Sequence, residues 1–195
     1  MPFKYAIVLS ILGVATSCEQ QSTAVADRKT SLSATVPDQA GPKVVELFQS
    51  QGCSSCPPAN AALNKIAGQT DIIALNYSVT YWDRLGWKDT FAKPAFTERQ
   101  RDYAKALKGN SVYTPQVILN GRIAIVGNGP GELQGAVLKM AAVRGGPTIV
   151  SDGSSISISA GKGAATVWLA RYDPPIYNRA IGPGENSGRT LPNRN

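Results

Sequence analysis

Apolar residues in this chain gather in short runs separated by polar and glycine-containing segments. Three of the runs are continuous and rich in β-branched residues, which is typical of strands buried on both faces. They span Lys43 to Gln49, Asp71 to Val79 and Gln116 to Leu119. Asn120-Gly121 follows the third run and is a strong signal for a two-residue hairpin, so Arg122 to Val126 is predicted to return antiparallel.

Three further segments are predicted to be helices. They are Ala59 to Ala67, Pro94 to about Leu107, and the amphipathic stretch Pro130 to Arg144. The order of elements from residue 43 is therefore β-α-β-α-β-β-α. A strand, a crossover helix and a second strand make a parallel pair, so the pattern predicts an α/β fold with a mixed sheet flanked by helices.

The pattern changes again in the last fifty or so residues. Ser155 to Ser159 alternates cleanly, Ala165 to Tyr172 reads as another strand, and Gly161-Lys162-Gly163 lies between them. This arrangement predicts an antiparallel β appendage over residues 147–195. Residues 178–195 are rich in Gly, Pro, Asn and Arg and are predicted to be a poorly ordered tail.

The beginning of the chain is predicted to be an export signal. Residues 1–17 have a short positive start, an apolar stretch and a small-residue cleavage region, which is typical of a signal peptide. Residues 18–42 are polar and predict a flexible tether. Cys18 stands where a bacterial lipoprotein carries its lipid; the alternative is ordinary cleavage after Ser17, which leaves a free thiol. Both alternatives predict a periplasmic or cell-envelope protein, in a compartment where disulfides persist.

Composition narrows the classes of function. The 195 residues are 43% hydrophobic and 17% charged, which suits one globular domain with or without a small appendage. The net charge of +7 is scattered without a basic cluster, so no nucleic acid partner is expected. The chain has no histidine, which excludes imidazole-based triads and histidine-bearing zinc sites.

The candidate chemistry lies in Cys53 and Cys56, two thiols three positions apart between the first strand and the first helix. Such a pair can open and close a disulfide, and a helix start stabilises the attacking thiolate. Zinc sites share this spacing but normally need four ligands, and the chain has three cysteines. Cys53 is predicted to be the exposed nucleophile and Cys56 the resolving thiol. The alternative is a static staple, which a four-residue ring would make worth only about 2 kcal/mol.

Separated motifs connect this pair with a known family. They are Val45-Glu46-Leu47-Phe48-Gln49-Ser50-Gln51-Gly52-Cys53-Ser54-Ser55-Cys56-Pro57-Pro58-Ala59, Tyr81-Trp82-Asp83, Leu85-Gly86-Trp87-Lys88-Asp89, Phe96-Thr97-Glu98-Arg99-Gln100, Tyr113-Thr114-Pro115-Gln116 and Gly184-Glu185-Asn186-Ser187-Gly188. The set resembles the DUF1223 family, exported bacterial thioredoxin-like proteins of unassigned biochemistry. The resemblance implies a thioredoxin-like fold over residues 43–146 and a C-terminal β appendage over 147–195. It also implies that Pro115 is cis and faces the cysteine pair, and that the Thr114 backbone is offered to an extended substrate.

The chain departs from the family pattern in two places. Ser78 and Thr80 stand where members usually carry a histidine and an aspartate, which removes a possible base near the site. The family appendage normally continues through further strands, so an incomplete appendage with an unpaired edge is expected.

Other residues of these motifs carry open alternatives. Trp82 and Trp87 either line a substrate-recognition surface or pack beneath the following helix while Asp83 or Asp89 caps a helix start. On that helix, two arginines are expected to be solvated or paired with neighbouring acids. The four residues concerned are Arg99, Arg101, Glu98 and Asp102.

The favoured function is thiol–disulfide exchange with a protein or peptide, and no cofactor or metal is predicted. The alternatives are a Cu(I) carrier that uses the same thiols and a non-enzymatic binding module. A membrane partner is predicted only through the possible lipid at Cys18.

Overall fold

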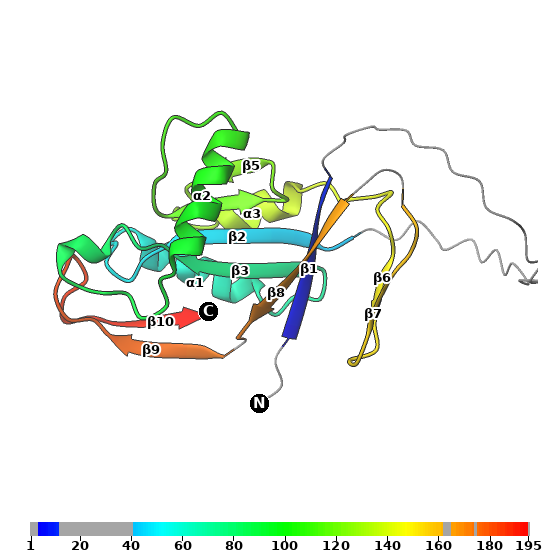
Figure 1. Ribbon diagram of the computed structural model, residues 1–195. Coiled ribbons are helices and arrows are strands. Elements are labelled where there is room, and N and C mark those ends of the chain that lie inside the picture. Colours follow the sequence, from blue (N-terminus) through cyan, green and yellow to red (C-terminus); the bar gives the residue numbers. More distant parts are fainter. Residues whose placement is uncertain (1–3, 12–40, 162–164, 174, 195) are drawn as a thin grey trace, which may run out of the picture. The chain divides into compact units, whose positions relative to one another are not determined.

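The computed structural model describes residues 4–11, 41–161, 165–173 and 175–194. Its centre is a four-stranded mixed sheet in the order β3-β2-β4-β5 (Figure 1). The strands are β2 (Lys43–Gln49), β3 (Ile72–Ser78), β4 (Gln116–Leu119) and β5 (Ile123–Ile125). Strand β2 runs parallel to β3 and antiparallel to β4, and β4 pairs antiparallel with β5. The predicted strand positions and the Asn120-Gly121 hairpin agree with this sheet.

Three helices flank the sheet, namely α1 (Cys56–Ile66), α2 (Pro94–Ala106) and α3 (Glu132–Lys139). Side chains of β2 alternate between the two faces because successive residues of a strand point in opposite directions. Val45 and Leu47 join a core with α1 and α3, whereas Phe48 joins a second cluster that Tyr103 of α2 closes. The predicted mixed α/β architecture is therefore confirmed.

The C-terminal residues differ from the predicted disordered tail. They form an antiparallel hairpin of β9 (Ile176–Ala180) and β10 (Thr190–Arg194), and β10 contacts α1. Residues 170–195 belong to the same compact unit as residues 42–142. The domain boundary predicted at residue 147 therefore does not separate this hairpin from the central sheet. Low apolar content suggested disorder, but buried polar side chains such as Asn186 and Asn193 provide the order instead.

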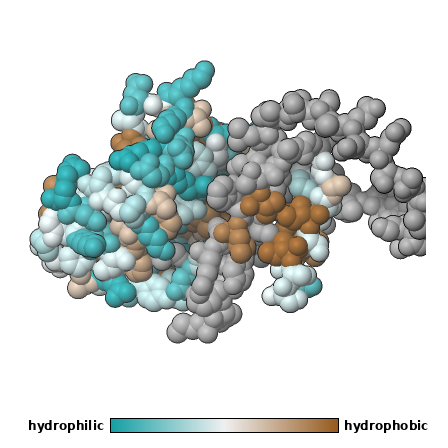
Figure 2. Space-filling model, in the orientation of Figure 1, coloured by the Kyte–Doolittle hydropathy of each residue, from teal (hydrophilic) through white to brown (hydrophobic). Residues whose placement is uncertain are grey.

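A second unit contains residues 143–169, with β6 (Ile149–Ser151) and β7 (Ile156–Ile158) paired antiparallel. Strand β8 (Ala165–Tyr172) pairs with β1 (Lys4–Ile11), not with β7. The predicted hairpin of 155–159 with 165–172 is therefore corrected: the tight turn at Asp152-Gly153 gives β7 a nearer partner, since Asp152 accepts hydrogen bonds from Ser154 and Ser155. Apolar side chains gather on the β6–β7 hairpin (Figure 2).

Several predictions concern residues outside this description. Cys18, the proposed cleavage region and residues 18–40 of the predicted tether lie within 12–40 and are not described. Strand β1 lies inside the predicted signal peptide, whose removal stays a prediction. Among the described residues, no helix has the length and apolar content needed to span a membrane.

Candidate functional site

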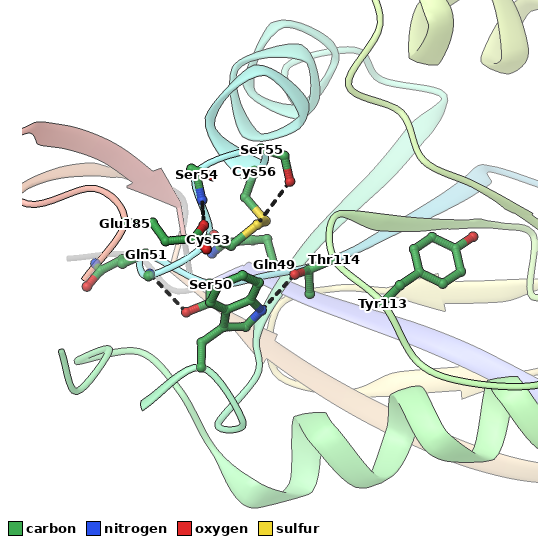
Figure 3. Close-up of a disulfide and its surroundings, with 12 residues drawn as sticks. Gln49, Ser50, Gln51, Cys53, Ser54, Ser55, Cys56, Tyr113, Thr114 and Glu185 are labelled. Atoms are coloured by element: carbon green, nitrogen blue, oxygen red, sulfur yellow. Dashed lines mark hydrogen bonds between the residues drawn. A yellow bond between two sulfur atoms is a disulfide. The ribbon is translucent and has the colours of Figure 1, made fainter. Parts of the chain in front are cut away.

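Cys53 and Cys56 form a disulfide at the end of β2, with Cα atoms 5.4 Å apart (Figure 3). Cys56 is the first residue of α1, and prolines follow it in the first helical turn, where a missing N–H costs nothing. The backbone N–H of Cys53 donates to the carbonyl of Ser50 at 3.1 Å. These bonds make residues 50–56 a compact turn, which we call the CxxC turn.

Both cysteines of this turn are buried, with exposed fractions of 0% for Cys53 and 1% for Cys56. The prediction that Cys53 is exposed is therefore corrected. Ser54 and Ser55, which lie between the cysteines, are exposed, so the disulfide lies directly beneath the surface. Two segments distant in sequence form hydrogen bonds with this turn, and the local pattern around the cysteines gave no sign of them.

One of these segments is the C-terminal loop, residues 181–189, which connects β9 to β10. The Asn186 side chain is fully buried, and its Nδ2 donates to the carbonyl oxygens of Gln51 and Cys53 at 2.8 Å each. The Glu185 carboxylate accepts a hydrogen bond from the backbone N–H of Ser54 at 3.0 Å (Figure 3). This bond lowers the pKa of Glu185 below its ordinary value. The loop therefore binds main-chain groups on both sides of the first cysteine.

The segment 81–89 holds the turn from another direction. Trp87 Nε1 donates to Gln51 Oε1 at 2.9 Å, and Asp89 accepts the Gln51 N–H at 2.8 Å. Burial raises the pKa of Asp89, although the N–H groups of Gln51 and Phe91 donate to it. The Trp87 ring also packs on Gly182 of the C-terminal loop, where a Cβ would lie 2.9 Å from ring carbons. Trp87 is thus a packing residue between the loop and the CxxC turn.

Trp82 links the CxxC turn to the Thr114-Pro115 segment. Its ring lies beside Gly52, and its Nε1 donates to Thr114 Oγ1 at 2.7 Å. The Thr114–Pro115 peptide bond is cis, as the family resemblance implies. Gln100 of α2 fixes the same segment, because its Nε2 donates to the Tyr113 carbonyl at 2.7 Å. Six of the predicted site residues therefore belong to one connected region: Cys53, Cys56, Trp82, Trp87, Thr114 and Pro115.

The chemistry available at the sulfurs includes one nearby hydroxyl. Ser55 Oγ lies 3.4 Å from Cys53 Sγ, within hydrogen-bond distance for sulfur (Figure 3). In the reduced protein, this hydroxyl can donate to a Cys53 thiolate and stabilise it. Among the described residues, no group of three or more Cys, Asp or Glu side chains forms a metal cluster.

A network of buried amide side chains connects β10 to α1, β2 and β3. Asn193 Oδ1 accepts from three side chains at 3.0 to 3.3 Å, and these donors are Gln49, Asn60 and Asn76. A cavity of about 20 Å³ lies beside this network, which is room for one water-sized molecule rather than a substrate.

Sequence reasoning missed a buried ion pair on the opposite face of the sheet. Glu46 is 0% exposed and accepts from Arg99 Nε and Nη2 at 2.8 and 2.6 Å, and it also accepts from the Tyr103 hydroxyl. Burial raises the pKa values of Tyr103 and Tyr77, and the negative Glu46 adds to the rise. Arg99 therefore pairs with Glu46, not with its helix neighbours as expected, whereas Arg101 pairs with Glu98. A lone carboxylate inside an apolar strand was the available signal for this pair.

One solved structure is similar to part of this chain. A crystal structure of a protein from Agrobacterium tumefaciens is 50% identical over 50% of this chain and 42% of that one, with a TM-score of 0.45. No curated protein matches the chain. The family model described as "Protein of unknown function (DUF1223)" matches residues 44–195, a range that includes most of β2, the CxxC turn, the C-terminal loop and β10. The chain belongs to the DUF1223 family.

Proposed function

We propose that this protein is a thiol–disulfide oxidoreductase of the bacterial envelope that exchanges disulfides with a protein or peptide through Cys53 and Cys56. The observation that carries the proposal is the closed disulfide at the first residue of α1, in a turn that Trp82 connects to Thr114-Pro115. A helix start favours the thiolate form of a cysteine, and the thiolate is the species that attacks disulfides.

The finer part of the fold proposal is that residues 43–146 form a thioredoxin-like domain. Supporting it are the order β3-β2-β4-β5, the parallel β2–β3 pair and the antiparallel β4 and β5. The disulfide follows the first strand of this sheet, and a cis proline precedes β4. Both positions agree with that fold.

The proposed exchange conserves atoms and electrons. A substrate thiolate attacks Cys53 Sγ, a bond forms between the two sulfurs, and Cys56 leaves as a thiolate. A second substrate thiolate attacks the mixed disulfide and releases Cys53. The substrate is oxidised to a disulfide, and the cysteine pair takes up two electrons and, from solvent, two protons. The reverse sequence reduces a substrate disulfide.

A purely structural role explains the disulfide less well. A four-residue ring restricts the unfolded chain little, and the loop-entropy expression gives it about 2 kcal/mol. Trp87 and Asn186 already donate hydrogen bonds to the same turn, and Asp89 accepts one from it. The covalent bond is therefore not needed to fix the turn.

A trapping experiment tests the proposed exchange. In the folded Cys56→Ser variant, Cys53 has no resolving partner, so incubation with glutathione disulfide is expected to accumulate a mixed disulfide at Cys53. The measurement is intact mass followed by peptide mapping, which distinguishes Cys53 from Cys18. The Cys53→Ser variant is the matched control. An adduct at Cys53 that forms only after unfolding in urea would contradict the proposal.

A further inference from the structure

We propose that the C-terminal loop is a removable cover that occupies, in the closed state, the main-chain groups of the CxxC turn with which a peptide substrate pairs. This inference rests on the proposed function, because it concerns how a substrate reaches the same disulfide. It adds a regulation of the site, and it defines the substrate as an extended peptide segment.

The first support is that the cover forms hydrogen bonds with main-chain groups on both sides of Cys53. Asn186 Nδ2 donates to the carbonyls of Gln51 and Cys53, and Glu185 accepts the N–H of Ser54. The loop thus presents one kind of donor and one kind of acceptor to the turn. An extended peptide carries the same two kinds of group on its backbone, as in the addition of a strand to an exposed edge.

The second support is that burial of the disulfide coincides with these contacts. Cys53 is 0% exposed, although Ser54 and Ser55, which lie between the two cysteines, are exposed. Attack on a disulfide requires a thiolate to approach one sulfur in line with the S–S bond. Exchange in the folded protein therefore requires a segment to move away from the sulfurs.

The third support is that the loop can open without loss of the hairpin below it. Two bonds close its base, from Ile181 N to Arg189 O at 2.8 Å and from Gly188 N to Ile181 O at 3.0 Å. Beyond this base, the hydrogen bonds from the loop to the CxxC turn come from an exposed carboxylate and one amide side chain, and the Trp87 ring packs on Gly182 of the loop. Openings of such few-contact segments have lower free energies than global unfolding.

Reduction by dithiothreitol tests the cover. One dithiothreitol thiolate attacks a sulfur of the pair, forms a mixed disulfide and releases the other cysteine. The second dithiothreitol thiol then attacks the mixed disulfide, releases the remaining cysteine and closes a cyclic disulfide. Dithiothreitol therefore loses the two electrons that Cys53 and Cys56 gain. The rate is measured on the folded full chain without denaturant, by quenching with iodoacetamide and mass analysis. Glu185→Ala removes one hydrogen bond to the turn, so we expect reduction to be roughly fivefold faster. Asn186→Ala removes two hydrogen bonds, so we expect reduction to be roughly 30-fold faster.

Two matched controls separate opening of the loop from general destabilisation. Glu132 is also an exposed carboxylate that accepts a backbone N–H, from Gly129 at 3.0 Å. Asn120 also holds main-chain groups of two segments, Val44 N–H and Ala141 carbonyl, at the β4–β5 turn. We expect Glu132→Ala and Asn120→Ala to change the reduction rate less than twofold.

Equal acceleration by loop and control variants, or no acceleration by either loop variant, would overturn the inference. Glu185→Ala keeps the test valid if Asn186→Ala fails to fold, because the Glu185 side chain is exposed. The outcome also separates this inference from the proposed function. Faster reduction without any glutathione adduct at Cys53 in the Cys56→Ser variant would support the cover and reject the exchange; the adduct without acceleration would do the reverse.

Discussion

Arg99→Ala is expected to lower the free energy of unfolding by about 3 kcal/mol, because it leaves a buried carboxylate without its cation. Glu46 lies on β2 at the centre of the sheet with 0% exposure. Arg99 donates to it from two nitrogens, and the guanidinium also lies over the rings of Tyr77 and Tyr103 at 5.6 and 5.2 Å. After the substitution, the Tyr103 hydroxyl still donates to this carboxylate but brings no positive charge.

Chemical denaturation of the wild type and variant, followed by circular dichroism, measures this effect. Arg101→Ala is the matched control, since Arg101 lies on the same helix two positions on and pairs with Glu98 where both side chains are more than half exposed. Exposed pairs contribute little, so this control is expected to change stability by less than about 0.5 kcal/mol. Similar losses for the two arginine variants would show that Glu46 is not held by Arg99.

The second large effect is expected for Asn193→Ala, with a loss of about 3 kcal/mol for three hydrogen bonds at roughly 1 kcal/mol each. Asn193 is 1% exposed and accepts from Gln49, Asn60 and Asn76. These residues belong to β2, α1 and β3, so the variant loosens β10 from three elements of the central unit. The measurement is again denaturant-induced unfolding.

Asn178→Ala is the control in the same hairpin, because Asn178 is exposed on β9 opposite Pro192 of β10. We expect a change within about 0.5 kcal/mol for this surface position. If Asn193→Ala changed stability as little as Asn178→Ala, the amide network of Asn193 would not stabilise the central unit, and the C-terminal residues would behave as a disordered tail.

Sequence patterns predicted the central sheet well because its signals are local. Lys43–Gln49 and Gln116–Leu119 have the predicted bounds as β2 and β4, and their continuous apolar runs leave no surface face. Pro94 marks the start of α2 as predicted, since proline suits the first helical turn. The CxxC motif likewise placed the disulfide correctly at the junction of β2 and α1.

The cover of the disulfide could not be predicted from local patterns. The segment 181–189 is polar and contains three glycines, a composition that suggests disorder when it is judged alone. Its order comes from side chains such as Asn186, which bind main-chain groups more than 130 positions away. The Gly184-Glu185-Asn186 motif was recognised, but a motif gives no partner. The exposure of Cys53 was predicted incorrectly for the same reason.

Measuring the equilibrium between the cysteine pair and mixtures of reduced and oxidised glutathione tests the central claim most directly. The account predicts that the folded protein equilibrates with these mixtures, with a reduction potential within the oxidoreductase range of about −270 to −120 mV. Native circular dichroism should persist throughout the titration. A pair that stays oxidised below about −300 mV, and that is reduced only when the chain unfolds, would contradict the account and leave the disulfide as a structural link.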